Sequence, residues 1–122
     1  MKILIAEDDS LILKTMEFCL KREGHEIIAC IDGMEAMGKI EETKPDLIIL
    51  DIMLPYFSGL EIVGKIKQEL NAVPVIVISA MGQQEVVEEA MRLGADEYIS
   101  KPFNITELVS HIARLTATAA IA

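Results

Sequence analysis

The chain alternates between two kinds of hydrophobic pattern. Short runs in which nearly every residue is apolar are followed by longer stretches in which apolar residues recur every three or four positions. Continuous apolar runs are typical of strands that are covered on both faces, and the longer spacing is typical of amphipathic helices. The pattern predicts five strands, at residues 2–6, 26–31, 46–50, 73–79 and 97–100. It also predicts five helices, at residues 10–23, 33–42, 60–70, 83–93 and 104–115.

Polar residues and glycines mark several of the predicted helix ends. Asp9 or Ser10 can cap the first helix, and Gly24 lies just past its end. Asn104, followed three residues later by Glu107, has the spacing of a capping box at the start of the last helix. These boundaries support the division into strands and helices.

The strict alternation of strand and helix predicts an α/β fold with a parallel sheet. Right-handed crossovers on both faces give a three-layer, doubly wound, flavodoxin-like arrangement with strand order 2-1-3-4-5. The strands at 2–6 and 46–50 are then neighbours at the point where the winding reverses. Ligands of such folds bind beyond the carboxyl ends of the strands at this point, so we expect the site there.

Length and charge narrow the class of protein. We expect one domain over residues 1–117, with residues 118–122 as a tail or the start of a linker. The net charge of −9, from 11 basic and 20 acidic residues, argues against nucleic acid binding by this domain itself. No apolar run reaches the roughly 18 residues of a membrane span, and the start does not resemble a signal peptide, so we expect a cytoplasmic location without membrane contact. Cys19 and Cys30 lack a metal-binding spacing, and we expect free thiols.

Polar residues stand where the predicted strands meet the expected crevice. Glu7 and Asp8 follow the first strand, and Asp51 follows the third. Ser79 closes the fourth strand, and Lys101 follows the fifth. Because the carboxyl ends of parallel strands share one edge of the sheet, we expect these side chains to converge.

The converging groups suggest a site for magnesium and phosphate. Glu7, Asp8 and Asp51 would repel one another unless a cation neutralised them, and Mg²⁺ is commonly bound by one or two carboxylates together with phosphate oxygens and water. Asp51 could be a metal ligand alone, or also a nucleophile toward phosphorus. Lys101 could neutralise phosphoryl charge, and the Ser79 hydroxyl could donate to a phosphoryl oxygen.

With these residues in place, the sequence resembles the receiver domain of bacterial two-component response regulators. The resemblance covers residues 2 to about 115 and rests on four motifs in order, "ILIAEDD", "DLIILDIMLPYFSGLE", "VIVISA" and "GADEYISKPF". It implies that Asp51 is the phosphoacceptor. It also implies that Glu7, Asp8, Asp51 and the backbone carbonyl of Met53 bind Mg²⁺.

The resemblance further implies a switch. Ser79, Tyr98 and Lys101 would sense the phosphoryl group, and a cis bond before Pro102 would direct Lys101 into the site. The change would pass to the face formed by the fourth helix, the fifth strand and the fifth helix. The implied protein is no ordinary enzyme, but a phosphorylatable switch that assists its own phosphoryl transfer and dephosphorylation.

The implied partners are a sensor histidine kinase or phosphotransfer protein, an output domain or partner protein, and a second copy of the chain on phosphorylation. The last motif is most similar to the winged-helix transcription-factor branch of the family. That branch commonly dimerises through charges on the fourth and fifth helices. His111 and Val87 stand where it usually has basic residues, so the dimerisation mode is left open. Met53 and Met81 are expected to influence the lifetime of the phosphorylated state.

Three other readings remain at this point. A binding-only pseudo-receiver would share the fold without being phosphorylated. An aspartate-nucleophile phosphohydrolase of the haloacid dehalogenase type would carry a second aspartate where this chain has Met53. A flavin or nucleotide carrier would need a phosphate-binding loop after the first strand, where this chain is acidic.

Overall fold

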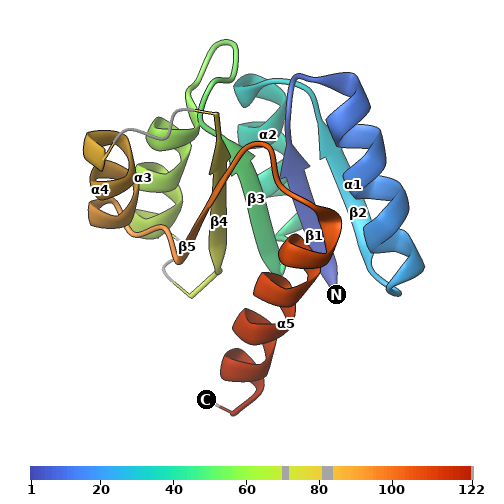
Figure 1. The fold of residues 1–122 in the computed structure, drawn as a ribbon. Coiled ribbons are helices and arrows are strands. Elements are labelled where there is room, and N and C mark those ends of the chain that lie inside the picture. Colours follow the sequence, from blue (N-terminus) through green and yellow to red (C-terminus); the bar gives the residue numbers. More distant parts are fainter. Residues whose placement is uncertain (70–71, 81–83, 122) are drawn as a thin grey trace.

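The computed structural model describes residues 1–69, 72–80 and 84–121, with side chains described as far as residue 116. The strands are β1 (Lys2–Ala6), β2 (Glu26–Cys30), β3 (Leu47–Asp51), β4 (Val75–Ser79) and β5 (Glu97–Ser100). The helices are α1 (Ser10–Arg22), α2 (Gly33–Thr43), α3 (Gly59–Glu69), α4 (Gln84–Arg92) and α5 (Ile105–Ile121). Strands and helices alternate along the chain as predicted (Figure 1).

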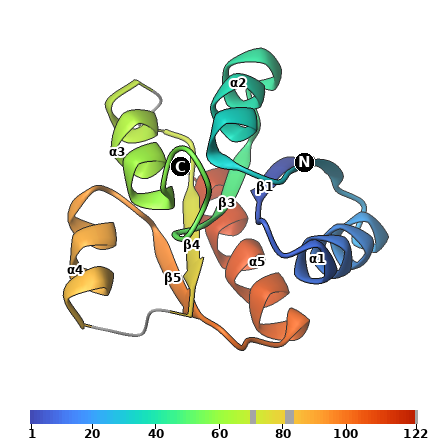
Figure 2. The same cartoon turned by 90° about the horizontal axis from the view of Figure 1, so that it is seen from above.

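The strands form one parallel sheet in the order β2-β1-β3-β4-β5. Helices α1 and α5 cover one face of the sheet, and α2, α3 and α4 cover the other (Figure 2). This is the three-layer, doubly wound, flavodoxin-like architecture predicted from the sequence. β1 and β3 are neighbours, so the reversal point lies between them.

Burial on both faces explains why the central strands are apolar throughout. Ile3 and Ile5 of β1 pack in the core on the α1/α5 side, whereas Leu4 packs in the core on the side of the other three helices. All three side chains are fully buried. Burying one such side chain contributes about 1.5–3 kcal/mol to folding, so a polar substitution at either face would be costly.

Side-chain caps start several of the helices. Asp9 caps α1 and accepts from the backbone N–H of Leu11 and Ile12, at 3.0 and 3.2 Å. Asn104 accepts from Glu107 N–H at 2.7 Å at the start of α5. Both caps agree with the sequence-based prediction.

Helix α5 is longer than predicted, because it continues to Ile121 instead of ending at residue 115 (Figure 1). The added segment is rich in alanine, the strongest helix former. The Thr116 hydroxyl bonds the carbonyl of Ile112 at 3.0 Å, which satisfies it within the helix. The division into a domain over 1–117 and a tail or linker over 118–122 stays a prediction.

Helices of the described residues are all too short or too polar to cross a membrane.

Candidate functional site

Three charged side chains meet at the carboxyl edge of the sheet. Glu7 follows β1, Asp51 ends β3 and Lys101 follows β5. Glu7 is fully buried and Asp51 is only 3% exposed. Lys101 Nζ lies 2.5 Å from Glu7 Oε1 and also donates to Asp51 Oδ2. The structure therefore brings together three residues that the sequence placed in one site.

The carboxylates form a cluster suited to a cation. One oxygen from each of Glu7, Asp8 and Asp51 lies within 4.8 Å of the others, and Asp8 is the exposed member. Apart from its ion pair with Lys101, Glu7 Oε1 has no hydrogen-bond partner in the described part of the chain. The Lys101 ammonium meets this buried oxygen, but one positive charge does not balance three carboxylates. An all-oxygen, acidic donor set at the mouth of a sheet fits Mg²⁺.

The Asp51 carboxylate is held from two sides. Its Oδ1 atom accepts from the Met53 backbone N–H at 2.8 Å, and its Oδ2 atom accepts from Lys101. The Met53 side chain is exposed. The role of the Met53 carbonyl as a metal ligand stays a prediction.

Ser79 and Lys101 are connected through the backbone. The Lys101 N–H donates to the Ser79 carbonyl at 2.8 Å, and the bond between Lys101 and Pro102 is cis, as expected from the resemblance. Ser79 is fully buried at the end of β4, beside the site's strand β3. Tyr98 is half-buried on β5, in register with Val77, and packs against the core on the α2–α4 side.

Burial and charge shift the proton affinities of the site. Burial, assisted by the neighbouring Asp51, raises the pKa of Glu7 from 4.5 to about 7, although Lys101 opposes the shift. Burial by itself lowers the pKa of Lys101, but hydrogen bonds to Asp51 and Glu7 outweigh it and hold that pKa above its ordinary value. The site therefore holds more negative charge than Lys101 neutralises, and a bound cation would relieve it.

Gly33 and Gly59, the first residues of α2 and α3, are not among the site residues predicted from the sequence. Both are buried against residues 52–58, the β3–α3 loop that follows Asp51. The available signal was a glycine at or just before the start of a predicted helix, at residues 33 and 59. Met81, also named from the sequence, lies outside the described residues.

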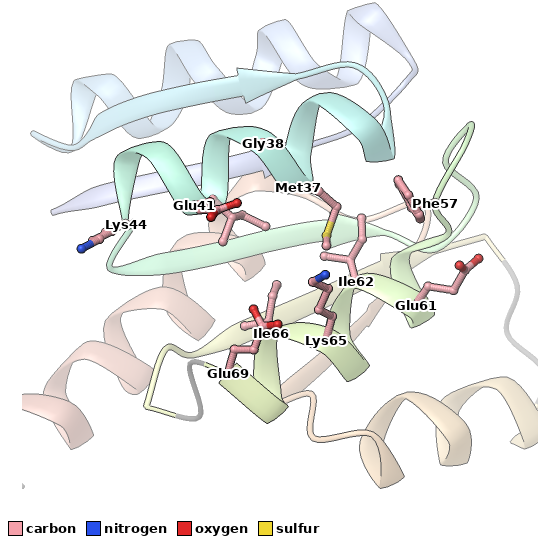
Figure 3. Close-up of a pocket in the computed structure, with 11 residues that line it drawn as sticks. Met37, Gly38, Glu41, Lys44, Phe57, Glu61, Ile62, Lys65, Ile66 and Glu69 are labelled. Carbon is pink, nitrogen blue, oxygen red and sulfur yellow. The ribbon is translucent and has the colours of Figure 1, made fainter.

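A groove between two helices lies away from these charges. It opens between α2 and α3, has a volume of about 590 Å³ and is lined by Met37, Lys65 and Ile66 among others (Figure 3). Phe57 of the β3–α3 loop lies at one end of it (Figure 3).

Comparison with known proteins assigns the chain and its fold to one family. Residues 3–113 match the response regulator receiver domain. The chain belongs to this family, whose members are phospho-accepting signalling domains. They act as switches, not as enzymes of the ordinary kind, and the family generally uses Mg²⁺ at an acidic pocket.

Curated relatives include two transcriptional regulators. The chain is 34% identical to the alkaline phosphatase synthesis transcriptional regulatory protein PhoP of Bacillus subtilis over 121 residues, which are 99% of this chain and 50% of that protein. It is 38% identical to the transcriptional regulatory protein PrrA of Mycobacterium leprae over 114 residues, 93% of this chain and 49% of PrrA. The chain thus spans about half the length of these relatives.

Solved structures show the same architecture. A CheY-like receiver domain protein from Methanospirillum hungatei superposes with a TM-score of 0.92 at 30% identity, over 99% of this chain and 98% of that one. The receiver domain of the Francisella response regulator 1452 superposes with a TM-score of 0.90 at 31% identity, over 97% of this chain and 98% of that one. The BeF3-activated receiver domain of DrrB superposes with a TM-score of 0.89 at 30% identity, over 95% of this chain and 97% of that one.

Proposed function

We propose that Asp51 accepts a phosphoryl group from the phosphohistidine of a histidine kinase or phosphotransfer protein. A carboxylate oxygen of Asp51 forms a bond to phosphorus, while the bond between phosphorus and the imidazole nitrogen breaks and its electron pair stays on the imidazole. The product is an acyl phosphate on Asp51. The observation that carries the proposal is the meeting of Asp51 with Glu7, Asp8 and Lys101 at the reversal point of the sheet.

The surrounding residues have separate tasks in this proposal. Glu7, Asp8, Asp51 and the Met53 carbonyl would hold Mg²⁺, which when bound neutralises negative charge on the phosphoryl oxygens. Lys101, which contacts both Asp51 and Glu7, would supply a further positive charge beside the phosphoryl group. The Met53 N–H orients the Asp51 carboxylate through its 2.8 Å hydrogen bond.

The switch step would begin at Ser79 and Lys101 and end on the α4–β5–α5 face. Phosphorylation would replace the Asp51 carboxylate charge, which Lys101 now contacts, with phosphoryl charge. The Lys101 backbone N–H donates to the Ser79 carbonyl, so a shift of Lys101 can reach Ser79. Tyr98 lies two residues before Ser100 on the same strand, half-buried between core and surface. β5 is tied to α5 by Glu97, which pairs with Arg114 at 2.5 Å and lies 3.4 Å from His111. A local charge change can thereby bias a two-state face.

The proposed partners follow from the family. The kinase or phosphotransfer protein would meet the carboxyl edge of the sheet, and an output domain or partner protein would meet the α4–β5–α5 face. A homodimer of phosphorylated chains is a further proposal, with its mode left open. The net charge of −9 supports the expectation that this domain does not itself bind nucleic acid. The cytoplasmic location remains a prediction.

Incubation with acetyl phosphate, followed by intact-mass measurement, tests the proposal. We expect a gain of one phosphoryl group that requires Mg²⁺ and is absent in Asp51→Asn. The matched control Asp46→Asn removes an exposed carboxylate at the other end of β3 and should gain the group as the wild type does. No gain under any condition would favour the binding-only pseudo-receiver. Substantial turnover of a generic phosphate ester would favour the phosphohydrolase instead.

A further inference from the structure

The β3–α3 loop is bonded to the first residue of two helices. The Gly33 N–H, at the start of α2, donates to the Pro55 carbonyl at 2.9 Å. The Gly59 N–H, at the start of α3, donates to the Ile52 carbonyl at 2.9 Å. The first turns of α2 and α3 therefore hold the backbone that follows Asp51.

Neither contact leaves room for a side chain. A Cβ atom on Gly33 would lie 2.1 Å from the Phe57 carbonyl oxygen, and one on Gly59 would lie 2.4 Å from the Asp51 carbonyl oxygen. The Gly59 Cβ would also lie 2.8 Å from the Cα atom of Ile52. These neighbours are largely backbone atoms, which cannot rotate away as a flexible side chain can. Any larger residue at either position must move the loop or the helix.

Gly38, in the middle of α2, shows that not every glycine here is required by packing. A Cβ atom at Gly38 would meet nothing within 4 Å. Alanine is favoured over glycine inside a helix by about 1 kcal/mol, so this position should accept alanine readily. Gly38 therefore provides a matched control for Gly33 on the same helix.

The loop also contains a backbone conformation that its surroundings must maintain. Tyr56 has a φ of 71°, in the left-handed region that residues with a Cβ seldom adopt. The neighbouring Pro55 carbonyl accepts two hydrogen bonds, from Gly33 and from Phe57. A conformation that is costly by about 1 kcal/mol or more persists only where neighbouring contacts fix it.

We propose that Gly33 and Gly59 are positioning residues for the phosphoacceptor site. Their missing side chains let the first turns of α2 and α3 close on the β3–α3 loop, and this fixes the backbone that presents Asp51 and Met53. The proposal rests on the proposed function, since it assigns these glycines a task in magnesium binding and phosphoryl transfer at that site.

The proposal also connects the β2 edge of the sheet to the site. α2 follows the edge strand β2, whose last residue Cys30 accepts from the Glu7 backbone N–H at 3.0 Å, and Gly33 contacts the loop directly. Further along the two helices a groove opens between α2 and α3, beyond Phe57 (Figure 3). The first residues of α2 and α3 are bonded to the loop. A larger side chain at residue 33 would therefore displace the loop and, through it, the backbone after Asp51.

The test compares Gly33→Ala and Gly59→Ala with the control Gly38→Ala. Calorimetric titration with Mg²⁺ alone gives the dissociation constant, and acetyl phosphate at saturating Mg²⁺ gives the rate of phosphorylation per folded molecule. We expect Gly33→Ala and Gly59→Ala to bind Mg²⁺ at least tenfold more weakly and to react at least tenfold more slowly, with the control within twofold of the wild type. A loss of stability with unchanged Mg²⁺ affinity and rate would show a purely structural role and overturn the proposal.

A second measurement needs no variant and covers the case in which an alanine variant fails to fold. Amide hydrogen exchange of the wild type, without metal, should show Gly33 and Gly59 N–H groups protected to a degree similar to Ile49 in β3. Exchange as fast as in an open loop would overturn the proposal. A wild type that binds Mg²⁺ but takes no phosphoryl group would contradict the proposed function alone, because the Mg²⁺ affinities would still test the glycines.

Discussion

At the scale of single residues, Lys101 places a positive charge beside two buried carboxylates. It contacts both Glu7 and Asp51, and its side chain is 18% exposed. Lys101→Ala would leave those carboxylates facing each other without a cation. We expect the variant to lose about 2 kcal/mol or more of stability without Mg²⁺, measured by urea unfolding.

The same variant separates phosphorylation from switching. Asp51 keeps its carboxylate, so acetyl phosphate should still label Lys101→Ala. We expect the phosphorylated variant to lack the amide shifts that phosphorylation causes in β5 and α5 of the wild type, measured by NMR. Lys65→Ala, at an exposed position on α3, is the control and should show the full shifts. Wild-type shifts in Lys101→Ala would contradict the role given to this lysine.

Glu7 should make the stability of the metal-free protein depend on pH. Its pKa is about 7 in the folded protein and near 4.5 without the fold, so between these values the folded state holds a proton that the unfolded state releases. Stability from this group is present below pH 4.5 and is lost as pH rises through 7, by on the order of 1–3 kcal/mol. Urea unfolding in EDTA at pH 5 and pH 8 should show this loss, and Glu7→Gln should reduce it. Equal losses in the two proteins would refute the assignment.

At the scale of elements, the N-terminal cap of α5 is a local determinant that the sequence already showed. Asn104 Oδ1 accepts from Glu107 N–H at 2.7 Å. Asn104→Ala should lower the free energy of unfolding by about 1 kcal/mol, because a helix N–H loses its partner. Ser110→Ala, at an exposed position within the same helix, should have a much smaller effect. If the two variants had equal stability, the cap would not contribute as described.

The order and type of the elements could be predicted because each follows from a local pattern. The continuous apolar run of β3 is required by burial on both faces, and a polar residue at its end is conspicuous for the same reason. Convergence of Asp51 with Glu7 then follows from topology alone. The site was predictable to the extent that it consists of strand ends.

Contacts that depend on exact backbone positions could not be predicted. The approach of Gly33 to Phe57 joins α2 to a loop that is more than twenty residues away in sequence. On α4, Arg92 pairs with Glu89 at 2.5 Å, whereas helical spacing alone also allows Glu88. Such choices depend on side-chain orientation and neighbouring elements, which a hydrophobic pattern does not contain.

At the scale of the whole molecule, three of the 20 acidic residues meet at one edge of the sheet. Mg²⁺ that binds only the folded state stabilises it by RT ln(1 + [Mg²⁺]/Kd), about 2.7 kcal/mol at one hundred times Kd. We expect the urea midpoint of the wild type to rise with Mg²⁺, and EDTA to reverse the rise. Asp8→Asn, which removes the exposed member of the cluster, should weaken the response. An equal rise in that variant would place the cation elsewhere.

The most direct test of the account is to locate the phosphoryl group on the chain. Borohydride reduces an acyl phosphate to an alcohol, so reduction after acetyl phosphate treatment should convert Asp51 into homoserine, which peptide mass spectrometry can identify. We expect this conversion at residue 51, and we expect it to depend on Mg²⁺. Conversion at another carboxylate, or a phosphoryl group that survives as an ester on a hydroxyl side chain, would contradict it.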